Sequence, residues 1–152
     1  MLSFELLCFI EQRQRVEIKV LQISPNSSFV ALGQPLKLNV TVTVNYVTDE
    51  RYHIPDSVHI RWSFRRFSST SFEELANALW HVDRNRVYTN SYDSRASIVD
   101  NATLVMVNAS LNDSGTYQCY IDSSYYFIGQ RVYFNVAIEG RYSSNVNLLK
   151  II

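Results

Sequence analysis

Glycine is scarce in this sequence, and its scarcity excludes several kinds of catalytic site. The 152 residues include only four glycines, each isolated from the others, so no glycine-rich loop is present to cradle a phosphate group. No serine lies in a Gly-x-Ser-x-Gly turn of the kind that exposes a hydrolase nucleophile. The three histidines, His53, His59 and His81, lack the spacing of metal ligands. We therefore expect no enzyme, no cofactor and no metal site.

An excess of charge and a long apolar run are also missing. Fourteen basic residues balance fourteen acidic ones, whereas nucleic-acid binding and polybasic membrane patches need a basic excess. No stretch approaches the roughly 20 apolar residues that a membrane-spanning helix needs. We expect no nucleic-acid partner and no direct membrane insertion by this fragment, so any membrane anchor or further domain would lie outside it.

Cysteine is rare, whereas glycosylation signals are frequent. Only Cys8 and Cys119 are present, so the chain is no disulfide-dense scaffold and the cysteine number does not identify a redox compartment. Five Asn-X-Ser/Thr sequons predict passage through the secretory pathway and N-linked glycans. The five candidate glycosylation sites are Asn26, Asn39, Asn101, Asn108 and Asn112. They favour an extracellular location, either as the ectodomain of a membrane protein or as a secreted protein.

Alternation of apolar and polar residues predicts β-strands along most of the chain. The clearest run is Leu36–Val44, and the ranges 57–64 and 131–138 repeat its period of two, which indicates strands with one buried face. The range 71–82 is compatible either with a helix capped by Ser71 or with a strand of a hairpin. Many short strands separated by turns predict an all-β sandwich or barrel.

Three features combine into a family resemblance. Trp62 lies on a predicted buried strand, the sequence DSGTYQC of residues 113–119 opens a later strand, and Arg95 precedes a third. This arrangement resembles the variable-type domain of the immunoglobulin superfamily over about residues 16–139. The resemblance implies a two-sheet antiparallel immunoglobulin-like β-sandwich.

The resemblance over residues 16–139 leaves a short segment at each end of the chain. We expect residues 1–15 to be an N-terminal extension or the remnant of a leader, because Glu5 interrupts an otherwise apolar run. Residues 140–152 are expected to form a C-terminal tail or a linker to a following segment.

The resemblance also implies roles for individual residues. Asp113 is expected to pair with Arg95, and the Tyr117 hydroxyl to bond backbone a few residues upstream, as in the tyrosine corner. Gly115 is expected to allow a backbone turn that a side chain would obstruct.

One departure from the family pattern concerns its core disulfide. The resemblance implies that Trp62 packs near Cys119, but Val40 stands where the partner cysteine would be. We expect Cys119 to be buried and unpaired against Val40, although a bond to Cys8 remains an alternative.

If the domain serves recognition, the candidates are the outward residues of the strands carrying Trp62 and Cys119 and of the last strand, together with the aromatic loop that precedes the last strand. Tyrosine and arginine are enriched at interface hot spots, although tyrosine is also simply a good strand former. The candidate partner-binding residues are Arg61, Gln118, Tyr120, Tyr125, Tyr126, Phe127 and Tyr133. No sequon falls within residues 46–100 or after Ser114, which predicts a glycan-free sheet.

The leading functional interpretation is the extracellular recognition domain of a cell-surface adhesion molecule or receptor. Its partner would be another protein or a second copy of the chain, and adhesion or allorecognition receptors with unusual core cysteines are one candidate group. An auxiliary subunit of a membrane channel or receptor complex is an alternative, because WSF followed by FEEL resembles sodium-channel β-subunits. A secreted immune-type binder or decoy is another.

Overall fold

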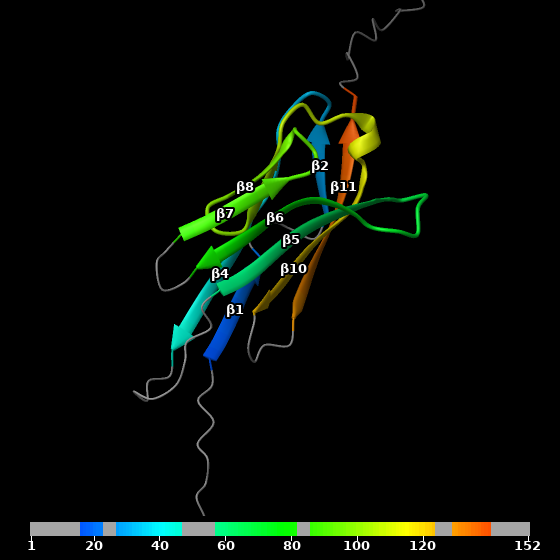
Figure 1. Ribbon diagram of the computed structural model, residues 1–152. Helices are drawn as coiled ribbons and strands as arrows, with labels where there is room; N and C mark the ends of the chain where they lie inside the picture. The colour runs from blue at the N-terminus through cyan, green and yellow to red at the C-terminus, as the bar shows by residue number, and fades with distance from the viewer. Residues whose placement is uncertain (1–15, 23–26, 47–56, 82–85, 124–128, 141–152) are drawn as a thin grey trace, which may run out of the picture.

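Strands dominate the computed structural model, which describes residues 16–22, 27–46, 57–81, 86–123 and 129–140 (Figure 1). The strands are β1 (Val16–Gln22), β2 (Ser27–Ala31), β3 (Leu36–Leu38), β4 (Val40–Tyr46), β5 (Ser57–Arg66), β6 (Glu73–His81), β7 (Arg86–Ser91), β8 (Ala96–Val99), β9 (Thr103–Met106), β10 (Gly115–Ser123) and β11 (Gln130–Glu139). One short 3₁₀ helix, η1 (Leu111–Asp113), precedes β10. The predicted all-β immunoglobulin-like sandwich is confirmed.

The larger layer of the sandwich is a six-stranded sheet in the order β2-β11-β10-β5-β6-β7. All its pairs are antiparallel except β11 with β2, whose arrows run in the same direction in Figure 1. A three-stranded sheet, β3-β9-β8, and the pair β1-β4 complete the described strands. The indole Nε1 of Trp62 donates to the carbonyl of Ala102 at 2.9 Å, which links β5 to the turn between β8 and β9.

The core forms where the alternating residues of the strands point inward. Trp62 of β5, Tyr117 of β10 and Phe134 of β11 are fully buried, and the rings of Trp62 and Phe134 lie 5.6 Å apart. Leu36, Leu38, Val40 and Val42 are buried in the opposing strands. Burial of these side chains from water is the main force that holds the two layers together. The period of two predicted for these strands is therefore confirmed where their burial is described.

Two predictions about individual elements need correction. The run Leu36–Val44 is not one strand, because it breaks at Asn39 into β3, which pairs with β9, and β4, which pairs with β1. The helix alternative for residues 71–82 is wrong, because this segment forms β6 against the edge of β5. Pairing with a buried strand overrides the helix preference of its Leu, Ala and Glu residues.

Cys119 is a free thiol in the centre of the core. It is fully buried and lies beside Trp62 in the pairing of β10 with β5. Burial raises the pKa of the Cys119 thiol, because the interior disfavours the thiolate. Cys8 and residues 47–56 lie outside the described residues.

We expect Cys119 to be unreactive in the folded protein. At neutral pH iodoacetamide should not modify it within hours, since alkylation needs an accessible thiolate. In denaturant the same residue should be modified quickly, as peptide mass spectrometry would show. Modification of Cys119 in the native protein at the denatured rate, or its recovery as a disulfide, would contradict this assignment.

Candidate protein-binding face

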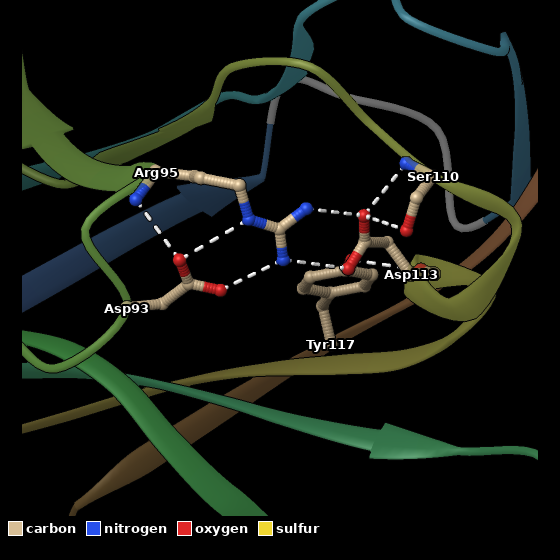
Figure 2. Close-up of polar contacts among 5 residues, drawn as sticks. All are labelled: Asp93, Arg95, Ser110, Asp113 and Tyr117. Atoms are coloured by element: carbon tan, nitrogen blue, oxygen red, sulfur yellow. Dashed lines mark hydrogen bonds and ion pairs between the residues drawn. The ribbon is translucent and has the colours of Figure 1, made fainter.

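The start of β10 is held in place by a cluster of ion pairs around Arg95 (Figure 2). The guanidinium lies between two carboxylates, with Arg95 Nη1 2.8 Å from Asp113 Oδ2 and Arg95 Nη2 2.9 Å from Asp93 Oδ2. Asp113 also accepts hydrogen bonds from the backbone N–H and the hydroxyl of Ser110, at 2.7 and 2.8 Å. The pairing of Arg95 with Asp113 that the resemblance implied is therefore present.

The protonation of this cluster follows from its contacts. Burial alone would raise the pKa of Asp113, but the hydrogen bonds from Arg95 and Ser110 outweigh it and hold that pKa below its ordinary value. The hydrogen bond from Arg95 likewise lowers the pKa of Asp93. The cluster is therefore fully ionised at neutral pH.

Tyr117 and Gly115 fix the path of β10 beyond this cluster. The Tyr117 hydroxyl donates to the carbonyl of Asp113 at 2.8 Å, which is the bond expected of a tyrosine corner. Gly115 acts differently from the prediction, because it is not among the residues with positive φ. A Cβ at Gly115 would instead collide with the backbone oxygen of Arg65 and the ring of Phe64. Its role is to permit the close approach of β5.

The inward residues of β5, β6, β10 and β11 belong to the core. The outward residues of the same four strands form a surface that we call the outer face. Arg61, Tyr120 and Arg131 occupy neighbouring positions on three of these strands. The Arg61 guanidinium carbon lies 4.9 Å from the centre of the Tyr120 ring, and that of Arg131 lies 4.7 Å from it. Both are cation–π distances.

Gly129 contributes to this arrangement because it has no side chain. A Cβ at Gly129 would overlap the hydroxyl and ring of Tyr120, so the glycine leaves room for the phenol. The ring is therefore held by two guanidinium groups and by the backbone just before β11. Such restraint lowers the entropy that the side chain would lose on binding.

A second aromatic group lies beside the first on the outer face. Gln118 Nε2 donates to the Tyr133 hydroxyl at 3.0 Å, and the rings of Tyr133 and Phe72 lie 6.5 Å apart. Arg65 lies over Phe72, 4.9 Å from its centre. The outer face thus offers aromatic rings with polar edges, the composition of an interface hot spot.

Comparison with known proteins agrees with this architecture. The sequence matches the family model of the immunoglobulin V-set domain over residues 23–137. The chain belongs to the immunoglobulin V-set family. No curated protein sequence matches it, and domains of this family are typically extracellular and bind other molecules rather than catalyse reactions.

Several solved structures share the fold of this V-set domain at low sequence identity. The extracellular domain of the voltage-gated sodium channel β4 subunit has a TM-score of 0.58 at 13% identity, with 80% of this chain and 98% of that chain covered. The two tandem V-type regions of VCBP3, a v-region-containing chitin-binding protein, give 0.61 at 15% identity, with 82% and 52% covered. A Dscam structure gives 0.52 at 14% identity, with 82% and 25% covered.

Most of the partner-binding residues predicted from the sequence meet on one surface of the V-set domain. Arg61, Gln118, Tyr120 and Tyr133 all lie on the outer face. The predicted aromatic residues Tyr125, Tyr126 and Phe127 lie outside the described residues.

The sequence analysis missed four contributors to the outer face, namely Arg131, Phe72, Arg65 and Gly129. The alternation over residues 131–138 puts Arg131 on the outward side of its strand, and this signal could have added it to the candidates. No pattern in the sequence indicated that Arg65 stacks on Phe72, because residues 71–82, which include Phe72, were also compatible with a helix.

The sequons that the structure describes lie outside the strands of the outer face. Asn39 separates β3 from β4, Asn101 lies in the turn between β8 and β9, and Asn112 lies in η1. Asn108 is exposed because β9 ends at Met106. Asn26 lies outside the described residues.

Asn101 makes a side-chain hydrogen bond to a neighbouring strand. Its Nδ2 donates to the carbonyl of Val42 at 2.9 Å, which connects the turn between β8 and β9 to β4. A glycan on this nitrogen would leave a single N–H to keep that bond.

In the part of the V-set domain that the structure describes, no group of three His, Cys, Asp or Glu residues could hold a metal ion. None of the described helices is long and apolar enough to cross a membrane.

Proposed function

We propose that this V-set domain is the extracellular recognition domain of a cell-surface adhesion molecule or receptor, and that it binds a protein partner through the outer face. The observation that carries this proposal is the ordered set of aromatic and arginine side chains around Tyr120 and Tyr133. Rigid aromatic groups with polar edges give large contact area at small entropic cost, which is why they dominate interface energetics.

The placement of the sequons supports the same surface. The described sequons lie outside β5, β6, β10 and β11, so glycans attached to them would leave these strands accessible. A glycan is bulky and hydrated, and one on the outer face would exclude a protein partner.

Structures that share the fold are described in terms compatible with this proposal. The sodium channel β4 extracellular domains form parallel homodimers that are said to explain a role in cell–cell adhesion. The Dscam structure concerns isoform specificity. An auxiliary subunit of a membrane channel is the second candidate function, supported by the coverage of nearly the whole β4 extracellular domain.

Truncation of either outer-face tyrosine should weaken binding strongly without unfolding the domain. Multivalent Tyr120→Ala and Tyr133→Ala domains are expected to bind cells of the source organism at least tenfold more weakly than wild type, since each hot-spot side chain contributes about 2 kcal/mol or more. Flow cytometry with the oligomerised domain measures this, and bead aggregation measures the homophilic version.

Leu111→Ala is the matched control for these variants. Leu111 is an exposed large side chain like Tyr133, but it belongs to η1 and not to the sheet. It should bind as wild type does. Equal binding by all three variants would exclude the outer face as the partner surface.

A further inference from the structure

We call Arg61, Tyr120 and Arg131 the stack, and its two arginines are not equivalent. The two guanidinium groups lie on one ring, yet they differ in their polar contacts. Arg61 Nη2 forms an ion pair with Asp122 Oδ2 at 3.1 Å. Within the described residues Arg131 forms no ion pair, and its side chain is exposed.

This asymmetry leaves one cation uncompensated at an ordered position. Asp122 offsets the charge of Arg61, so the stack retains about one unit of positive charge on a chain whose formal net charge is zero. A guanidinium that stacks through its flat surface keeps its N–H groups free around its edge. These donors match the two oxygens of a carboxylate in a fork-shaped pair.

We infer that the stack is a binding site for a carboxylate and that the partner is a different protein with acidic side chains at the contact. This inference rests on the proposed function and adds the chemistry of the partner to it. The Tyr120 ring supplies apolar contact beside the charge, and the room left by Gly129 keeps the ring in place. A carboxylate that enters would pair with Arg131 without first displacing an acidic residue described here.

The carboxylates of β6 in a second copy of the chain fit this site less well than those of an acidic protein do. The exposed carboxylates of β6, Glu73 and Glu74, lie next to Phe64 and Ser63 of β5 in the strand pairing. Arg65 and Arg66 follow directly in the sequence of β5. A copy that brought these carboxylates to the stack would bring two further cations with them, and like charges across an interface are unfavourable.

Surface plasmon resonance of the whole glycosylated chain over an immobilised peptide of alternating Glu, Asp and Gly tests the inference. The reference surface carries the same peptide with Gln and Asn in place of Glu and Asp. We expect retention on the acidic peptide only, falling as NaCl is raised from about 50 to about 300 mM, because salt screens exposed charges. Arg131→Gln should lower retention about tenfold, the loss of one charge-assisted pair.

The variants Arg86→Gln and Tyr120→Leu distinguish binding at the stack from nonspecific attraction by the charge of the whole chain. Arg86 is an exposed arginine of β7, so its replacement changes the net charge as Arg131→Gln does and should leave retention unchanged. Tyr120→Leu keeps every charge and should still weaken retention. Equal losses from Arg86→Gln and Arg131→Gln, or equal retention on the neutral peptide, would overturn the inference. Stronger retention on heparin, also lost in Arg131→Gln, would assign the site to a sulfated polysaccharide and overturn the acidic-protein partner.

The inference and the proposed function can fail separately. If Tyr133→Ala weakens cell binding while Arg131→Gln does not, the outer face binds a protein but the carboxylate site is wrong. If the acidic peptide binds as expected while Tyr120→Ala and Tyr133→Ala both leave cell binding intact, the stack binds carboxylates but the outer face is not the partner surface.

Discussion

Replacing Asp113 by alanine is expected to lower the free energy of unfolding by about 2–3 kcal/mol. The substitution removes a nearly buried carboxylate, leaves Arg95 without one of its two partners, and frees the Ser110 N–H that Asp113 accepts from. Buried polar groups that lose a charged partner typically cost this much. Urea denaturation followed by circular dichroism measures the change.

Asp93→Ala is the matched control, because it removes the same charge from the same arginine. Asp93 is more exposed than Asp113, so its loss should cost about 1 kcal/mol or less. Equal effects of the two substitutions would show that burial does not distinguish these ion pairs.

The pH dependence of stability provides an independent test of the same cluster. The pKa of Asp113 is lower in the folded protein than its ordinary value, so its contribution is present above the unfolded pKa of about 3.9. The contribution is lost as the pH falls through the lower folded value. Asp113→Asn should therefore lose less stability between about pH 5 and about pH 2 than wild type does. A parallel loss in both proteins would contradict the assignment.

Placing a cysteine at position 40 should raise the free energy of unfolding by about as much as Asp113→Ala lowers it. Val40 and Cys119 are both fully buried, and Val40 occupies the position that the family resemblance gives to the partner cysteine. Val40→Cys is expected to form a disulfide with Cys119 and to raise the free energy of unfolding by about 2–4 kcal/mol, mainly because the cross-link restricts the unfolded chain.

The control for this prediction is the same variant under reducing conditions. Reduced Val40→Cys should be no more stable than wild type, since cysteine fills less of the core than valine does. Non-reducing peptide mapping identifies the bond. Failure to form it under oxidising conditions would show that Val40 and Cys119 do not face each other across the sandwich.

The strands with one buried face could be predicted from the sequence because burial imposes a period of two. The alternation around Trp62 and Phe134 therefore identified β5 and β11 together with their inward residues. The break at Asn39 could not be predicted, because the alternation of apolar residues continues across it. Which neighbour each half pairs with, β9 or β1, is decided by contacts distant in sequence.

The outer face was predictable as a set of outward residues but not as an arrangement. The alternation placed Arg61 and Tyr120 on one surface, yet it does not show that Arg131 shares the same ring. The role of Gly129 likewise depends on the position of the phenol. Such contacts arise from side-chain conformations across three strands, on which a linear pattern carries no information.

The central claim, that the outer face binds a protein partner, is tested most directly by placing a glycan on it. Tyr133→Asn combined with Asn135→Thr creates an Asn-Phe-Thr sequon at two exposed positions of β11. Ser97→Asn combined with Val99→Thr creates an Asn-Ile-Thr sequon at two exposed positions of β8, in the other sheet. With occupancy confirmed by mass spectrometry, the glycan on β11 should abolish binding of the multivalent domain to cells, and the glycan on β8 should leave it unchanged. Undiminished binding by the domain glycosylated on β11 would contradict the account.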